Sequence, residues 1–320
     1  NTAVGINSMT QNTSGTRNVA VGAYALQNNT TSNDNTAVGY YALGTSNGGY
    51  ENTAVGRNAM ASMTTGAMNT AVGVQALNTA STGNNNSMFG MYSGQAITTG
   101  GANTGVGYMS MYGLTTGADN IAIGKQALQA TQTHSQNVAI GNDALKANTA
   151  ASNVAVGHIV LQANTTGAQL TAVGKQALKA NTSGADNTAV GCDCLDANTT
   201  GNANTAVGRS ALSANATTHY NTALGYRALR QTTHHSNVGI GWQALQANTA
   251  GDANVAIGKN CLSSCTSGRI NVMVGADGFS SLTTGYFNTG IGYECGNQIT
   301  TGANNVLLGF YAGRSQGNFS

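Results

Sequence analysis

The stretch Asn187-Thr188-Ala189-Val190-Gly191, completed by Asn198-Thr199-Thr200-Gly201, contains the pattern that decides the fold. Its first half, approximately Asn-x-Ala-(Val/Ile)-Gly, recurs nineteen times, spaced by seventeen residues except for two steps of sixteen. Self-similarity at a fixed period is typical of stacked repeats, so we expect one repeat array over residues 1–320 without an internal boundary. The repeated glycines are Gly5, Gly22, Gly39, Gly56, Gly73, Gly90, Gly107, Gly124, Gly141, Gly157, Gly174, Gly191, Gly208, Gly225, Gly241, Gly258, Gly275, Gly292 and Gly309.

The three residues before each glycine predict a short β-strand. With the glycine as position 0, position −3 is β-branched in all but one copy, and position −1 is always large and apolar. Residues two apart share one face of a strand, and β-branched side chains suit that surface. The pattern therefore predicts a parallel β-solenoid in which −3 and −1 face the interior, and the small residue at −2, usually Ala, points outward.

The glycine and the asparagine at −4 predict two structural columns. The glycine indicates a turn in a backbone conformation that a Cβ would resist. Asn stands at −4 in every copy but one, where Leu170 replaces it, and stacked amides can bond to their neighbours above and below. The expected amide ladder includes Asn1, Asn18, Asn35, Asn120, Asn187 and Asn254. After the glycine, residues such as 175–180 fit either a second strand or one helical turn.

Composition excludes several classes of protein. No apolar run approaches the ~20 residues that cross a bilayer, and the 12 Lys and Arg residues are scattered singly, so neither membrane insertion nor nucleic-acid binding is expected. Only 7% of the residues are charged. Stacked coils place each side chain ~4.8 Å from its equivalent, where like charges repel but Asn and Thr can pair.

The expected outward row of alanine favours self-association over exposure to water, although alanine also tolerates exposure in a tight β-arc. Cyclic symmetry is the commonest arrangement for such self-association. The chain begins at the first residue of a repeat and ends near the close of another. We therefore expect either a segment of a longer fibre protein or a subunit that stacks end to end into a filament.

The motif resembles two families. Residues 120–127, Asn-Ile-Ala-Ile-Gly-Lys-Gln-Ala, resemble the head repeats of trimeric autotransporter adhesins, which form left-handed parallel β-rolls of three chains. The longer unit, 187–201, is similar to stalk arrays in phage tail-fibre and tail-spike proteins. The resemblance covers the whole chain and implies a homotrimeric fibre with a surface role.

Residues that carry chemistry do not form a recognisable constellation. The cysteines lack zinc spacing, and three of them stand at +3, where small buried residues are usual. A metal site at His219, His234 and His235 is weighed against solvated turn residues. The ten carboxylates are dispersed, so we expect no catalytic, cofactor-binding or metal site and no enzyme activity. The cysteines are Cys192, Cys194, Cys261, Cys265 and Cys295.

Two surface columns suggest binding. Thr recurs at +8, where a hydroxyl row would suit ice or carbohydrate, although Thr also fits turns and ladders. Aromatic residues after the glycine, such as Tyr40 and Trp242, suit sugar stacking or interchain packing equally well. Asn-x-Ser/Thr sequons one coil apart are candidate glycosylation sites: Asn164, Asn181, Asn198 and Asn215.

These observations predict a structural fibre at the extracellular or virion surface, acting as a rigid spacer or adhesive stalk. The alternatives are a self-polymerising extracellular filament and, more weakly, an ice- or carbohydrate-binding solenoid. The expected partners are further copies of the chain, as a homotrimer or an end-to-end polymer, together with a cell-surface glycan or receptor.

Overall fold

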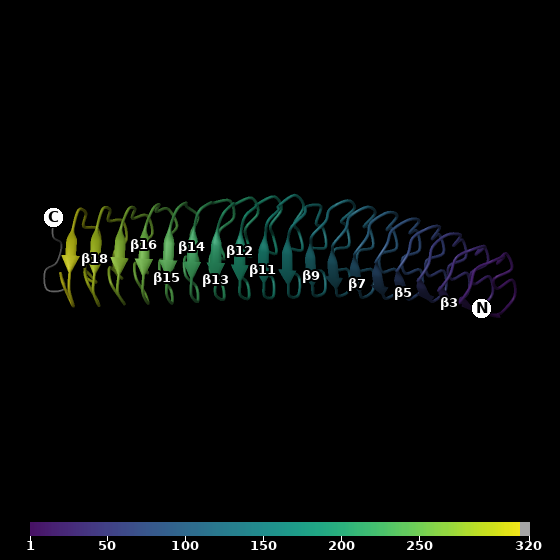
Figure 1. Cartoon of the computed structure of the whole chain (residues 1–320). Coiled ribbons are helices and arrows are strands. Elements are labelled where there is room, and N and C mark those ends of the chain that lie inside the picture. Colours follow the sequence, from purple (N-terminus) through teal and green to yellow (C-terminus); the bar gives the residue numbers. More distant parts are fainter. Residues whose placement is uncertain (314–320) are drawn as a thin grey trace. The chain divides into compact units, whose positions relative to one another are not determined.

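The computed structural model describes residues 1–313, in which every regular element is a three-residue β-strand. The chain divides into two compact units, residues 1–158 and the residues from 159 onward. Each unit is a parallel β-solenoid with one strand per coil of about seventeen residues (Figure 1). The prediction of an all-β solenoid with nineteen strands is confirmed for the described residues.

The strands coincide with positions −3 to −1 of the repeat. The first unit contains β1 (Thr2–Val4), β2 (Val19–Val21), β3 (Thr36–Val38), β4 (Thr53–Val55), β5 (Thr70–Val72), β6 (Ser87–Phe89), β7 (Thr104–Val106), β8 (Ile121–Ile123), β9 (Val138–Ile140) and β10 (Val154–Val156). The second contains β11 (Thr171–Val173), β12 (Thr188–Val190), β13 (Thr205–Val207), β14 (Thr222–Leu224), β15 (Val238–Ile240), β16 (Val255–Ile257), β17 (Val272–Val274), β18 (Thr289–Ile291) and β19 (Val306–Leu308).

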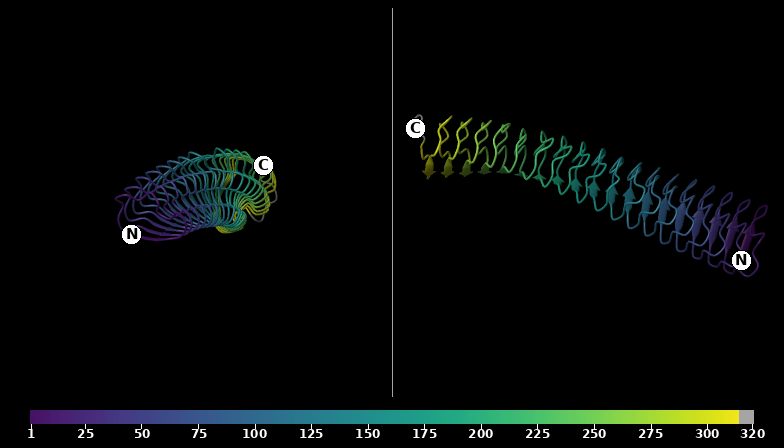
Figure 2. Two further views of the ribbon diagram at one scale, coloured as in Figure 1. Left: turned by 90° about the vertical axis from the view of Figure 1, so that its right-hand side faces the viewer. Right: turned by 90° about the horizontal axis from the view of Figure 1, so that it is seen from above.

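Neighbouring strands within a unit pair in parallel and in register, so equivalent residues lie over one another. In β12 and β13, Thr188 pairs with Thr205 and Ala189 with Ala206. Figure 2 shows the strands of successive coils side by side within each unit. Backbone bonds also join the loops, because the Leu195 amide donates to the carbonyl of Ala211 at 3.1 Å. The whole contour of a coil is therefore bonded to its neighbours.

The orientation that we expected for the strand is wrong: the central residue faces the interior and its two neighbours face outward. In β12, Ala189 is fully buried, whereas Thr188 and Val190 are partly exposed. The interior is already occupied by larger buried side chains at −4, +4 and +7, such as Asn187, Leu195 and Asn198 in the same coil. Only a small residue fits opposite them, which explains the alanine column.

The segment after the glycine is neither a strand nor a helical turn. It contains two non-glycine residues in the left-handed region, at +2 and +4, such as Asp193 (φ 55°) and Leu195 (φ 50°). A third lies at −5, as at Ala203 (φ 53°). Such residues cost about 1–3 kcal/mol each. The inter-coil bond of the Leu195 amide and the burial of its side chain offset this cost.

Candidate functional site: the strand face and the side-chain columns

The repeated glycine turns the chain where no side chain fits. Its φ lies between 123° and 143° in all nineteen copies. A Cβ added at Gly191 would lie 2.6 Å from the carbonyl oxygen of Gly208, one coil away. The position therefore needs glycine for two reasons, the backbone conformation and the close approach of the next coil.

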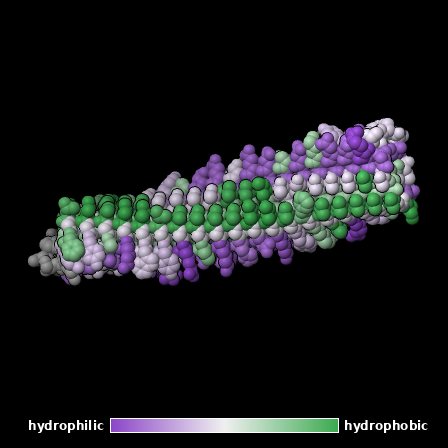
Figure 3. All heavy atoms as spheres, turned by 60° about the horizontal axis from the view of Figure 1, so that its bottom comes forward, coloured by the Kyte–Doolittle hydropathy of each residue, from purple (hydrophilic) through white to green (hydrophobic). Residues whose placement is uncertain are grey.

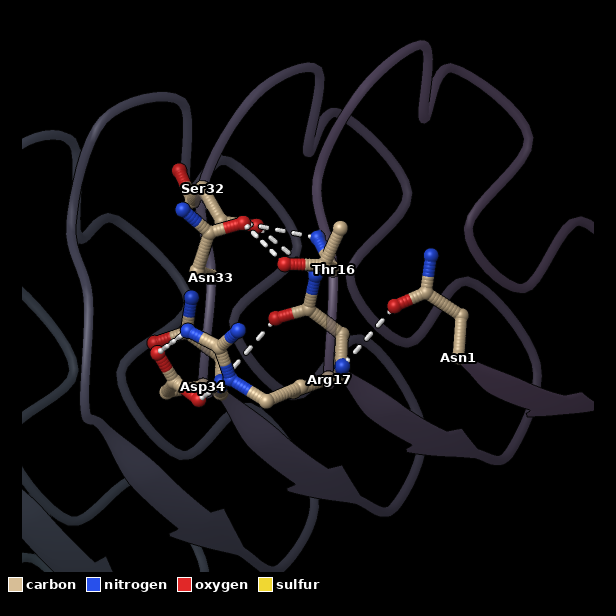
Figure 4. A network of polar contacts seen from close by, with 8 residues as sticks. Asn1, Thr16, Arg17, Ser32, Asn33 and Asp34 are labelled. Atoms are coloured by element: carbon tan, nitrogen blue, oxygen red, sulfur yellow. Dashed lines mark hydrogen bonds and ion pairs between the residues drawn. The ribbon is translucent and has the colours of Figure 1, made fainter.

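The asparagines at −4 form a column of shared hydrogen bonds. Asn204 donates from its backbone amide (2.9 Å) and from Nδ2 (3.1 Å) to Oδ1 of Asn187, one coil away. Nδ2 of Asn187 donates to the carbonyl of Gly201 at 2.7 Å. Bonds from the backbone amide to the preceding Oδ1 recur at Asn18, Asn35, Asn120 and Asn254, and Oδ1 of Asn1 accepts the first of them (Figure 4). The column gives buried backbone and side-chain polar groups hydrogen-bond partners without placing a charge in the coil interior.

A second amide column at +7 contains the four sequon asparagines, and it corrects our expectation of glycosylation. Asn164, Asn181, Asn198 and Asn215 are all fully buried. Nδ2 of Asn181, the atom that a glycan would modify, donates to Oδ1 of Asn164 at 2.8 Å and to the carbonyl of Gly184 at 2.9 Å. A glycan at these nitrogen atoms is incompatible with the folded coil.

The outward side chains at −3 and −1 form an apolar surface, which we call the strand face. Position −1 is Val, Ile, Leu or Phe in every copy, −3 is Thr, Val, Ile or Ser, and neither position carries a charge. Figure 3 shows these apolar rows with hydrophilic side chains beyond them on either side. Its large apolar members that are more than a third exposed in interior coils are Val21, Phe89, Val106, Ile121, Ile123, Ile140, Val154, Leu224, Ile257, Val274 and Ile291.

Nine of the 22 charged residues (12 basic and 10 acidic) lie on the two edges of the strand face, acids on one and bases on the other. The edge at −5, which precedes the strand, carries an acidic rim: Asp34, Glu51, Asp119 and Asp186. The edge at +1, which follows the glycine, carries a basic rim: Arg57, Lys125, Lys175, Arg209 and Lys259. Sequence reasoning missed this sorting, although it becomes visible once charges are tabulated by repeat position.

The sorting is partial. Position +2, next to the basic rim, carries Asp143, Asp193, Asp277, Glu294 and Arg227. Arg17 stands at −5, one coil from Asp34, and its guanidinium binds that carboxylate through Nε (2.5 Å) and Nη2 (2.8 Å), as Figure 4 shows. These hydrogen bonds hold the pKa of the Asp34 carboxyl below its ordinary value. The rest of the acidic and basic rims take part in no ion pair within the described chain.

The histidines of adjacent turns act as backbone acceptors. Nδ1 of His219 accepts the amide of Asn202 at 2.8 Å, and Nδ1 of His235 accepts the amide of His219 at 3.1 Å. The two rings stack with centroids 5.3 Å apart. Because Nδ1 must stay unprotonated in both rings, Nε2 carries the proton and has no lone pair for a metal. Across residues 1–313, no three His, Cys, Asp or Glu residues are grouped to hold a metal ion.

Four of the five cysteines, all except Cys192, are small buried residues. Burial raises the pKa of the Cys194 thiol to about 12 and that of Cys261 to about 11. Cys192 is partly exposed, and its hydrogen bond to the Asp193 carboxylate raises the pKa of its thiol. All five thiols are free of disulfides.

The threonine and aromatic columns make contacts within the chain. Oγ1 of Thr182 donates to the carbonyl of Thr199 at 3.0 Å, and this bond recurs through much of the +8 column, so these hydroxyl protons are already engaged. In the +1 column, Lys259 lies over the Trp242 ring, with Nζ 5.7 Å from its centroid. Both columns therefore support the coil itself.

Within residues 1–313, no helix is long and apolar enough to cross a membrane. No family model, curated protein or solved structure matches the chain.

Proposed function

We propose that this protein is a structural fibre of the extracellular or virion surface, a rigid spacer or adhesive stalk whose length is set by its number of coils. The observation that supports this role best is the continuity of inter-coil bonding around the whole contour. In the coil of residues 187–203, seven backbone amides donate to carbonyls of adjacent coils, the first at Thr188 and the last at Ala203. The proposed spacer has no catalytic part.

Rigidity follows from how the interior is held. The asparagine columns at −4 and +7 lie beside the alanine and leucine columns in the coil interior. Both the polar and the apolar side chains therefore hold each coil in alignment with the next. Sliding or bending between coils breaks several of these contacts at once. Repeat proteins of this kind gain stability from each neighbour interface, so adding coils adds length without changing the fold.

Coil duplication tests the spacer role. Four extra copies of residues 187–203, inserted after Ala203, preserve every column and add about 19 Å at ~4.8 Å per coil. Small-angle X-ray scattering should detect this increase in maximum dimension. A matched insertion of flexible Gly-Ser residues is the control, because it should broaden the distance distribution without a discrete increase. An unchanged maximum dimension after coil duplication would contradict the proposal.

Location requires a separate experiment. Immunogold electron microscopy of the source cells, and of any phage particles they release, should place label on an outer surface. Label confined to the cell interior would overturn the surface assignment while leaving the spacer architecture untouched.

A further inference from the structure

One turn of the first unit departs from the repeat. At positions +8 and +9 it contains Asn47-Gly48, the single Asn-Gly step in the sequence, where most coils carry Thr followed by Thr or Ser. Both residues are exposed. We propose that they form a self-modifying site, in which the Gly48 nitrogen attacks Cγ of Asn47 and expels ammonia. Water then opens the resulting succinimide to aspartate or isoaspartate.

The attacking nitrogen lacks the hydrogen bond that holds its equivalent in the next coil. There, the amide of Thr65 donates to a carbonyl of the following coil at 3.1 Å. The amides of Asn47 and Gly49 both donate to the carbonyl of Thr64, at 3.1 and 3.2 Å. The Gly48 amide between them donates to no group of the described chain. It therefore faces water, where a base can remove its proton and make the nitrogen nucleophilic.

Glycine at position 48 leaves the path between the two reacting atoms open. Its φ is 153°, which glycine adopts without steric cost. A Cβ here would lie 3.2 Å from Cγ2 of Thr65, so a side chain would crowd the turn. Ring closure needs the nitrogen and Cγ of Asn47 in a near-attack geometry, and the freedom of the glycine backbone gives access to it.

The side-chain amide of Asn47 is activated at one atom and unrestrained at the other. Its Oδ1 accepts a hydrogen bond from Oγ1 of Thr30, one coil away. A donor at this oxygen stabilises the negative charge that develops on it as the nitrogen attacks. Nδ2 has no hydrogen-bond partner in the described chain. Elsewhere in the +8 column the threonine hydroxyl donates to a backbone carbonyl instead, as Thr182 does to Thr199.

The reaction balances with water as its one co-reactant. The bond from the Gly48 nitrogen to Cγ forms as the bond from Cγ to Nδ2 breaks. The proton lost by the Gly48 nitrogen returns through solvent to Nδ2, which leaves as ammonia. Water then adds to one of the two ring carbonyls. Attack at Cγ restores the main chain with an aspartate side chain, whereas attack at the main-chain carbonyl leaves the chain running through Cγ as isoaspartate.

The fold protects the asparagines of the −4 column from the same reaction. Asn52 is fully buried, and its Nδ2 donates to Oδ1 of Asn35 at 3.2 Å and to the carbonyl of Gly66 at 2.8 Å. The amide that would attack it, that of Thr53, donates to the carbonyl of Asn69 at 2.8 Å. Both the nucleophile and the leaving group are therefore held, and the exposed turn is the reactive position.

Peptide mass spectrometry of the aged full chain tests the site. Trypsin cleavage after Arg17 and Arg57 releases residues 18–57, which contain Asn47 together with the buried Asn35 and Asn52. Incubation should convert the amide at position 47 to an acid, faster at higher pH because the attacking nitrogen must lose its proton. Isoaspartyl methyltransferase should label part of the product. The two buried asparagines of the same peptide should stay amides.

Matched variants separate the effect of the fold from that of the Asn-Gly step itself. Thr53→Gly creates a second Asn-Gly step in the buried column, which should convert in denaturant but not in the folded protein, whose fold circular dichroism verifies. Gly48→Thr should reduce conversion at position 47 to the level of the buried asparagines, and Thr30→Val should slow it.

No conversion at position 47 in folded wild type, under conditions in which the denatured chain converts, overturns the proposal. Equal conversion at positions 47 and 52 in folded Thr53→Gly would show that the turn confers nothing beyond its sequence, and also overturns it. Equal rates in Thr30→Val and wild type contradict activation by the hydroxyl. These readouts are chemical, so they stand or fall independently of the length measurement that tests the spacer role.

Discussion

At the scale of single residues, the fold depends on side chains that stack over copies of themselves. Oδ1 of Asn187 accepts two hydrogen bonds from the next coil, and Gly191 leaves only backbone beside Gly208. The sequence alone predicts both columns, because residue type and spacing define them. It does not predict the left-handed conformation of Leu195, since leucine rarely adopts it, although aspartate, which stands at Asp193, is one of the residue types enriched there.

Gly191→Ala is expected to destabilise the protein by about 2–4 kcal/mol, because a Cβ meets the Gly208 carbonyl and φ is 140°. Gly309→Ala is the matched comparison: its φ is 123°, but a Cβ there has nothing within 4 Å. Denaturant unfolding should show a clearly smaller loss for Gly309→Ala. Equal losses would mean that the close approach between coils contributes nothing.

At the scale of the strand, the sequence predicts the element and its bounds but not which face is buried. The alternation shows that the residues at −3 and −1 share one face of the strand. It does not show whether that face points into the coil or out of it. The space remaining in the coil decides the matter, and it admits alanine at −2 because Leu195 and both amide columns occupy the rest. The apolar face that we expected to form the core instead points outward and is partly exposed.

Burial of the Cys194 thiol beneath the strands makes the stability of the protein depend on pH. The Sγ atom of Cys194 lies 3.2 Å from the carbonyl oxygen of Ala206 in β13. Its pKa of about 12 exceeds the ordinary thiol value of ~8.5, so the folded state retains this proton when the unfolded chain loses it. Stability contributed by the neutral thiol is constant below about pH 8.5 and declines as pH rises toward 12.

Cys194→Ala should therefore reduce the decline in unfolding free energy between pH 8 and 10.5 by about 1–2 kcal/mol relative to wild type. Ala177 and Ala211 occupy the same position in adjacent coils, so the variant fits. The measurement is denaturant unfolding under reducing conditions, where the difference between variants cancels other titrating groups. Identical pH profiles for the two proteins would contradict burial of this thiol.

At the scale of the molecule, low charge has a structural cause. Stacking places each residue over its equivalent in the next coil, so most columns hold Ala, Leu, Asn, Thr or Gly. No charged residue of the described chain is fully buried. The repeat period predicts the architecture from sequence, whereas the exposure of the apolar positions −3 and −1 becomes visible only in the folded coil.

The most direct test of the account is X-ray diffraction from the aligned protein. Coils stacked through parallel strands predict a sharp meridional reflection at ~4.8 Å, along the stacking direction. The reflection should survive Gly309→Ala and weaken in Gly191→Ala. A pattern without a meridional ~4.8 Å reflection, or one dominated by the ~5.4 Å helical pitch, would contradict the stacked-coil architecture on which every other proposal rests.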